Sequence, residues 1–342
     1  MTETRKRKGL KRIAFILAIL VLAYTVCAFL PPKQNFPIEN PLLKAEGELP
    51  ALVAHRGGND EFPGNTLEAF YHAYSIDPDV IMETDVNITK DGVLILLHNT
   101  QLDATTNVTG LASDWNYTDL LAERVDFGYK NPTEDGWLDG EREHFNVDGV
   151  NKYPTDVSYP EGVSPRDEEI FLVTTLEELI TAFPNNRISI EIKQEGELGI
   201  KAVREAVRVV EKHDAFDRVI FASFHTKVYK EYKKMARAGE VPENFMYSPG
   251  MMGIVKFYSL YILGLDSLFF DGVAVLQIPM EKYGFNFATK RLIDAAHEHN
   301  VAVQYWTVDD EEDMRHLIEI GTDGIMTDRP TKLREVYNDW QW

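Results

Sequence analysis

Ionisable side chains follow three short apolar runs in the first third of this 342-residue chain. The runs cover residues 52–54, 80–82 and 93–97. The side chains that follow them are His55 and Arg56, Glu83 and Asp85, and His98. Building a core does not require this repeated placement, whereas an active site at the carboxyl-terminal mouth of a parallel barrel does.

These residue types favour one kind of chemistry. Glu83 and Asp85 are two apart on a predicted strand, so both point to one face, where hard carboxylate oxygens suit Mg²⁺ or Ca²⁺. Two histidines can divide the acid and base roles, and an arginine beside one of them can hold a phosphate. Each residue alone has an ordinary structural interpretation. Their convergence predicts metal-assisted phosphodiester cleavage.

The elements that must position these residues alternate between strand and helix patterns. Nine segments are strand-like, one more than an eight-stranded barrel needs. The tight turn Lys90-Asp91-Gly92 joins two of them, and one of these two is a candidate for a strand outside the barrel. We interpret that turn as hairpin chemistry, not as part of the site. Residues 65–76 fit a helix capped by Asn65 or Thr66. The alternation predicts an α/β fold, a (β/α)₈ barrel.

Residues 50–332 resemble the glycerophosphodiester phosphodiesterase family, which has a phosphodiesterase barrel like that of phosphatidylinositol-specific phospholipase C. The matching motifs follow the family's order along the chain. They are His55-Arg56-Gly57, Pro63-Gly64-Asn65-Thr66 with Ala69-Phe70, Glu83 with Asp85, Lys90-Asp91-Gly92, His98-Asn99, Glu191-Ile192-Lys193, Trp306-Thr307-Val308 and the stretch 321–330.

The resemblance implies a role for each site residue in the hydrolysis of glycerophosphodiesters to glycerol 3-phosphate and an alcohol. A neighbouring substrate hydroxyl would attack phosphorus, and water would open the cyclic phosphate. The roles are general base and acid for His55 and His98, ligands of Ca²⁺ or Mg²⁺ for Glu83, Asp85 and Glu191, phosphate contacts for Arg56 and Lys193, and stacking on the alcohol for Trp306. Packing explains the tryptophan equally well.

Three positions depart from the family pattern. Gly64 stands where the family has Glu, Asn99 where it has Asp, and Ala104 where Arg is common. The five core residues remain, so we expect an active variant. Two alternatives stay open: a lysophospholipase D that acts on acylated glycerophosphodiesters, and a binding barrel without catalysis.

The amino terminus differs in composition from the rest of the chain. A basic tail (1–12) precedes an uncharged run (13–30) long enough to cross a bilayer, followed by a linker (31–48) and the barrel (49–335). The basic flank predicts a single-pass anchor in the cell membrane with an extracellular catalytic domain. A cleaved signal peptide is the rival, and lipidation of Cys27 is a weaker one. Cys27 is the only cysteine, which excludes a disulfide in the barrel.

Charge and composition complete the expectations. The net charge of −20 argues against nucleic acid as a partner, and no obligatory protein partner is inferred. We expect a small-molecule or lysolipid substrate. Residues 113–168 lose strand and helix periodicity and predict an insertion. We expect it to lie over the barrel mouth as a lid or to shape the substrate site, with a peripheral decoration as the alternative. The apolar stretch 251–270 fits a core helix, or a groove for an acyl chain or a membrane contact.

Overall fold

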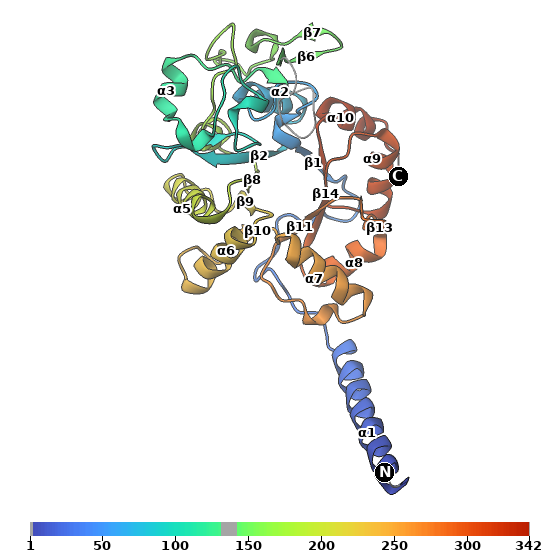
Figure 1. Cartoon of the computed structure of the whole chain (residues 1–342). Coiled ribbons are helices and arrows are strands. Elements are labelled where there is room, and N and C mark those ends of the chain that lie inside the picture. The colour runs from blue at the N-terminus through green and yellow to red at the C-terminus, as the bar shows by residue number, and fades with distance from the viewer. Residues whose placement is uncertain (1–2, 131–141, 342) are drawn as a thin grey trace.

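Eight parallel strands form a nearly closed barrel in the computed structural model, which describes residues 3–130 and 142–341 (Figure 1). The strands lie in the order β10-β9-β8-β2-β1-β15-β14-β11. Their bounds are β1 Ala51–Ala54, β2 Ile81–Ile88, β8 Ile188–Ile192, β9 Val219–Ala222, β10 Met246–Tyr247, β11 Val275–Ile278, β14 Ala302–Tyr305 and β15 Gly324–Thr327. The two end strands meet through the Ala274 amide, which donates to the Tyr247 carbonyl at 3.1 Å. The predicted (β/α)₈ barrel is confirmed.

One helix follows each barrel strand and covers its outer side. These helices are α2 Leu67–Ile76, α4 Leu176–Ala182, α5 Gly196–Lys212, α6 Thr226–Ala238, α7 Met251–Ile262, α8 Lys290–Glu298, α9 Glu311–Ile320 and α10 Pro330–Asn338. Several begin at hydroxyl or carboxylate caps; Thr66, for example, accepts from the Ala69 amide at 3.2 Å. The strands are buried on both faces, which explains why they read as continuous apolar runs in the sequence.

The extra strand predicted beside the Lys90-Asp91-Gly92 turn is β3 (Leu94–Leu96). It pairs antiparallel with β2 and lies off the path of the barrel. Asp91 accepts from the Thr89 hydroxyl at 2.6 Å and from the Tyr117 amide at 3.0 Å. These bonds shape the turn and tie it to the next segment, so the structural interpretation of this motif is confirmed.

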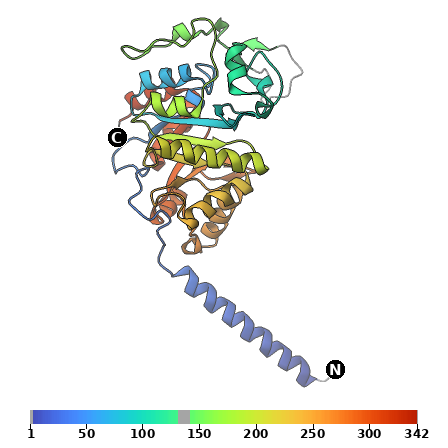
Figure 2. The ribbon, with the colours of Figure 1, turned by 90° about the vertical axis from the view of Figure 1, so that its left-hand side faces the viewer.

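An insertion between β3 and α4 carries small elements of its own. They are α3 Tyr117–Ala122, β4 Tyr129–Lys130, β5 Glu143–His144, β6 Asn146–Val147 and β7 Val150–Asn151. Residues 131–141, which belong to the predicted insertion, lie outside the described residues. Arg166 fastens the insertion to the barrel helices, with Glu68 at 3.6 Å and Glu178 at 3.2 Å. Figures 1 and 2 place it beside α2, at the opposite end of the molecule from α1.

Short 3₁₀ turns and one further hairpin complete the described elements. They are His55–Gly57, Leu102–Ala104, Ala112–Asp114, Pro154–Asp156 and Asp266–Leu268, with the hairpin β12 Glu281–Lys282 and β13 Phe285–Asn286 after β11.

Residues 35–43, which we call the closing segment, cover the amino-terminal end of the barrel. Phe36 and Leu42 are buried and pack against the first residues of the adjoining strands: Ile220, Met246, Ala274, Val275 and Ala302. The Asn40 side chain donates to the Ala274 carbonyl at 2.7 Å and to the Asn300 carbonyl at 2.9 Å. The predicted linker over 31–48 is indeed without helix or strand, yet this part of it is fixed to the barrel and is not a free tether.

The helix α1 (Glu3–Ala28) extends away from the barrel as a separate rod (Figure 2). Its residues 11–28 have a mean hydropathy of 2.0, and none of this span is buried. The carboxyl-terminal end of the helix contacts the barrel: Tyr24 donates to the Leu263 carbonyl at 2.7 Å, and Ser267 donates to the Cys27 carbonyl at 3.0 Å. The helix also includes most of the predicted basic tail.

Candidate active site

A cavity of about 200 Å³ opens at the carboxyl-terminal ends of the barrel strands. Seven of the eight predicted site residues line it: His55, Arg56, Glu83, His98, Glu191, Lys193 and Trp306. The eighth, Asp85, is almost fully buried and contacts Arg56 and Lys193. The remaining walls are Ser189, Ala222, Ser223, Phe224, Ser248, Pro249, Gln277, Thr307 and Met326.

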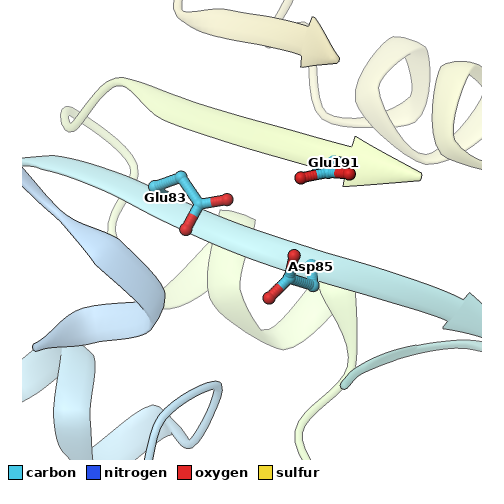
Figure 3. Close-up of side chains that lie close together, drawn as sticks. All are labelled: Glu83, Asp85 and Glu191. Carbon is cyan, nitrogen blue, oxygen red and sulfur yellow. The ribbon is translucent and has the colours of Figure 1, made fainter. Parts of the chain in front are cut away.

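Three carboxylates, Glu83, Asp85 and Glu191, lie close together, as Figure 3 shows. Glu83 and Asp85 come from one face of β2, and Glu191 comes from the neighbouring strand β8, where it pairs in register with Asp85. One oxygen atom of each lies within 4.8 Å of the others. The strand geometry that predicted a shared face for Glu83 and Asp85 thus also brings in the third carboxylate.

Two cations partly balance these carboxylates. Arg56 Nε lies 3.1 Å from Asp85 Oδ2, and Lys193 Nζ lies 3.5 Å from Asp85 Oδ1 and 3.2 Å from Glu191 Oε1. Burial opposes ionisation of Asp85, but Lys193 and Arg56 outweigh it and hold the pKa of that carboxyl well below its usual range. The same contacts favour the charged form of Lys193. Burial lowers its pKa, but Asp85 and Glu191 raise the pKa by more, so the net shift is upward.

The other two carboxylates are less well compensated. Burial and the charge of Asp85 raise the pKa of Glu83 to about 7. Burial also raises the pKa of Glu191, with Asp85 adding to the effect and Lys193 opposing it. A buried group of three carboxylates, two of which resist ionisation, fits a divalent cation. Such an ion would relieve their repulsion, and Ca²⁺ and Mg²⁺ prefer oxygen ligands.

His55 is oriented by a carboxylate from the last barrel strand. Its Nδ1 lies 2.7 Å from Asp328 Oδ1, and the Asp328 amide in turn donates to Asp309 at 2.8 Å. Its Nε2 lies 4.0 Å from Glu83. Burial and Arg56 lower the pKa of His55, but Asp328 and Glu83 outweigh them, so the net shift is upward.

His98 has the opposite electrostatic surroundings. Burial, together with Arg56 and Lys193, lowers its pKa to about 4 although Asp85 opposes this shift. Its Nδ1 contacts the side-chain oxygen of Asn99. A neutral amide can orient the ring, yet it cannot raise the pKa as a carboxylate would. The departure from Asp at position 99 therefore affects the protonation of His98 more than its placement.

The other two departures have structural explanations. A Cβ at Gly64 would lie 2.4 Å from Asn59 Oδ1, so a larger residue there requires Asn59 to move. Ala104 is buried in the turn Leu102–Ala104. The described residues that line the cavity do not include Gly64, Asn99 or Ala104.

Sequence analysis missed two residues that hold the site together. Asn65 donates to Asp85 Oδ2 at 3.0 Å and accepts from the Asp85 amide at 3.1 Å. In the sequence it was part of the Pro63-Gly64-Asn65-Thr66 motif and a candidate helix cap, without a role in the site, and the cap is Thr66. Asp328 holds His55, and it directly follows β15. The strand-end pattern that identified the other residues applies to it as well.

The insertion does not line the cavity in the part of the chain that the structure describes. Every lining residue except His98, which follows β3, belongs to a barrel strand or to the loop that follows it. None falls within 113–130 or 142–168. Aromatic contacts instead hold the insertion to α2, with the rings of Tyr159 and Tyr71 5.2 Å apart. These contacts favour a peripheral decoration over a lid.

The barrel and its cavity define a class of protein, the (β/α)₈-barrel hydrolases. The chain belongs to the glycerophosphoryl diester phosphodiesterase family, whose sequence profile matches residues 55–332. Members of this family hydrolyse phosphoric diesters, and the chain is an enzyme of this type. The resemblance found in the motifs is confirmed.

Individual relatives agree with this assignment. The chain is 28% identical over 282 residues to a glycerophosphodiester phosphodiesterase of Caldanaerobacter subterraneus, covering 82% of the chain and 95% of the relative. It is 26% identical over 351 residues to human lysophospholipase D GDPD1, covering 96% of the chain and 98% of the relative.

Solved structures show the same fold. A glycerophosphoryl diester phosphodiesterase domain from Mycobacterium tuberculosis has a TM-score of 0.63 at 18% identity, covering 84% of the chain and 99% of the domain. A phosphodiesterase from Oleispira antarctica, in complex with the product sn-glycerol-3-phosphate, has a TM-score of 0.58 at 20% identity, covering 85% and 98%.

Proposed function

We propose that the cavity hydrolyses glycerophosphodiesters to glycerol 3-phosphate and an alcohol, with a divalent cation held by Glu83, Asp85 and Glu191. The observation that carries this proposal is the meeting of the three carboxylates with two histidines from separate strand ends. When bound, Ca²⁺ or Mg²⁺ would neutralise charge on the phosphate oxygens. Arg56 and Lys193 lie where they can stabilise the further charge that develops in the transition state.

The histidines would divide the proton transfers. Asp328 occupies Nδ1 of His55, which leaves Nε2 to accept the proton of the attacking substrate hydroxyl. His98 would protonate the leaving alcohol, and water would then open the cyclic phosphate. A pKa of about 4 is low for that acid, and the negative charge of a bound phosphodiester would raise it.

The test is release of glycerol 3-phosphate from glycerophosphocholine by the full chain in lipid nanodiscs. We expect turnover that EDTA abolishes and that added Ca²⁺ or Mg²⁺ restores. Turnover that persists in EDTA would contradict the role of the cation. No turnover of glycerophosphocholine or of its acylated form, with the metal bound, would contradict the hydrolysis itself and favour a binding barrel.

We further propose that α1 is a retained membrane anchor with its basic end in the cytoplasm and the barrel outside. The support is one apolar span near the amino terminus, residues 11–28, preceded by a basic flank. A cleaved signal peptide would pass the same test of length and composition.

A lysophospholipase D is the second candidate. The similarity to human lysophospholipase D GDPD1 extends over 96% of the chain, which includes more than the barrel. Its substrate would differ from glycerophosphocholine by one acyl chain. A binding site for an acyl chain beside the cavity would therefore favour the lysophospholipase D over the first candidate.

A further inference from the structure

An apolar groove of about 320 Å³ lies beside the catalytic cavity. One wall is a face of α7 that carries Met251, Val255 and Ile262. The opposite wall is the hairpin β12–β13 with the residues that follow it, including Phe285 and Phe287. The proposed hydrolysis of a small polar substrate makes no use of this space.

Aromatic packing holds the two walls together. The Tyr258 ring of α7 lies 4.6 Å from the Phe287 ring and 5.8 Å from the Phe285 ring, measured between centroids. At the hairpin turn, Tyr283 and Gly284 both have positive φ, the conformation of a tight two-residue turn. The groove is therefore a built feature of the fold and not a gap between unrelated surfaces.

The groove and the cavity adjoin and share part of their walls. Phe224 and Trp306 line both of them, with ring centroids 5.6 Å apart. From this junction the groove follows α7, whose 12 residues span about 18 Å. A molecule whose phosphodiester lies in the cavity can thus extend an apolar substituent past the two rings and along the helix.

The far end of the groove lies beside the apolar helix α1. Ile262 lines the groove, and the carbonyl of the next residue, Leu263, accepts from Tyr24 in the last turn of α1. The surface at this end is apolar and exposed, with Ile262 56% and Leu263 54% accessible. An occupant that comes from a lipid bilayer would reach the groove from this side.

We propose that the groove binds the single acyl chain of a monoacyl glycerophosphodiester, that is, a lysophospholipid drawn from the membrane. This proposal rests on the proposed function, because the phosphodiester would occupy the catalytic cavity. One apolar groove joined to one polar cavity matches a substrate with one hydrocarbon chain and one phosphodiester.

The experiment compares glycerophosphocholine with its hexanoyl, octanoyl and decanoyl monoesters, below their micellar concentrations, on the full chain in nanodiscs. We expect kcat/KM to rise with chain length, by up to about fourfold for each methylene that the groove buries. Val255→Glu places a charge in the groove and should lower kcat/KM for the decanoyl ester at least tenfold, while glycerophosphocholine turnover is unchanged. Met252→Glu is the matched control, on the same helix but outside the groove.

The outcomes separate the two proposals. If kcat/KM does not depend on chain length, or if both variants behave alike, the acyl-chain groove is wrong while the proposed hydrolysis stands. If no substrate is hydrolysed, the proposed hydrolysis is wrong, and the groove is then judged by binding alone. For that purpose, binding of the decanoyl ester is measured by calorimetry in a His98→Ala background, where Val255→Glu should weaken it and Met252→Glu should not.

Discussion

The two histidines of the site have opposite electrostatic surroundings. Asp328 contacts His55 and helps to outweigh burial there. The neutral Asn99 contacts His98, where burial and two nearby cations outweigh the charge of Asp85. At neutral pH this difference favours the proton on His55 rather than on His98 in the absence of substrate. The assignment of base and acid therefore depends on how a bound phosphodiester and its cation shift the pKa values of His55 and His98.

Replacing either histidine tests the acid–base mechanism. We expect His55→Ala and His98→Ala each to lower kcat by about 10²–10⁴-fold, because each variant loses one positioned proton transfer. Circular dichroism should show an intact barrel in both. Normal turnover in both variants would contradict the proposed mechanism.

Replacing Asp328 tests how His55 is held. Asp328→Asn removes the carboxylate that raises the pKa of His55, so we expect a lower kcat and an ascending limb of the pH–rate profile at lower pH. Asp91→Asn is the control, because Asp91 shapes the turn after β2 and does not line the cavity. An unchanged profile for Asp328→Asn would show that His55 does not titrate as the base.

The raised pKa of Glu83 predicts pH-dependent cation binding. Glu83 must lose its proton to bind Ca²⁺ or Mg²⁺, and its pKa is about 7 in the cation-free protein. Affinity should therefore rise by about tenfold per pH unit below pH 7 and level off above it. Isothermal titration calorimetry between pH 5.5 and about 8 measures this dependence. Glu83→Gln should weaken binding and remove the step, whereas constant affinity in the unmodified chain would exclude Glu83 as a ligand.

At the scale of single residues, sequence identified the side chains that project from strand ends. His55, His98 and Glu191 lie at or just after the ends of β1, β3 and β8. Glu83 and Asp85 instead lie within β2, which continues to Ile88, yet all five side chains gather as predicted. Asn65 escaped because it lies in a loop before α2 and touches Asp85 only after the chain folds back. No local pattern distinguishes that contact from helix capping.

At the scale of elements, the alternation of strand and helix patterns predicted the barrel. The helix expected over 65–76 is α2 (Leu67–Ile76), which begins two residues later because Thr66 is its cap. The closing segment gave no such signal. Its two buried apolar side chains, Phe36 and Leu42, lie in a short stretch of prolines and polar residues without strand or helix periodicity.

The burial of Phe36 predicts a measurable contribution to stability. Phe36 is 1% exposed at the end of the barrel, so Phe36→Ala should lower the free energy of unfolding by about 3–5 kcal/mol. Phe29→Ala is the matched control, since Phe29 is 83% exposed and should change little. Urea unfolding of the two variants in the same nanodiscs makes the comparison. Equal stability would mean that the closing segment is not required by the barrel.

At the scale of the whole molecule, the question is whether α1 is retained. We expect membrane fractions to contain the chain with residues 1–30 still attached, as intact mass spectrometry would show. A protein without those residues should remain in the aqueous fraction and keep its turnover of glycerophosphocholine, because the catalytic cavity contains none of them. A mature protein that begins near residue 31 would instead identify α1 as a signal peptide.

The closing segment has a consequence for the range over which the enzyme works. Only residues 29–34 separate α1 from this segment, and a linker of this length spans at most about 20 Å when fully extended. If α1 spans the bilayer, the barrel cannot drift into solution or reach a neighbouring cell. Encounters with a lysophospholipid substrate would then occur in two dimensions, on the leaflet beside which the enzyme is anchored. Turnover would follow the surface density of lipid and not its bulk concentration.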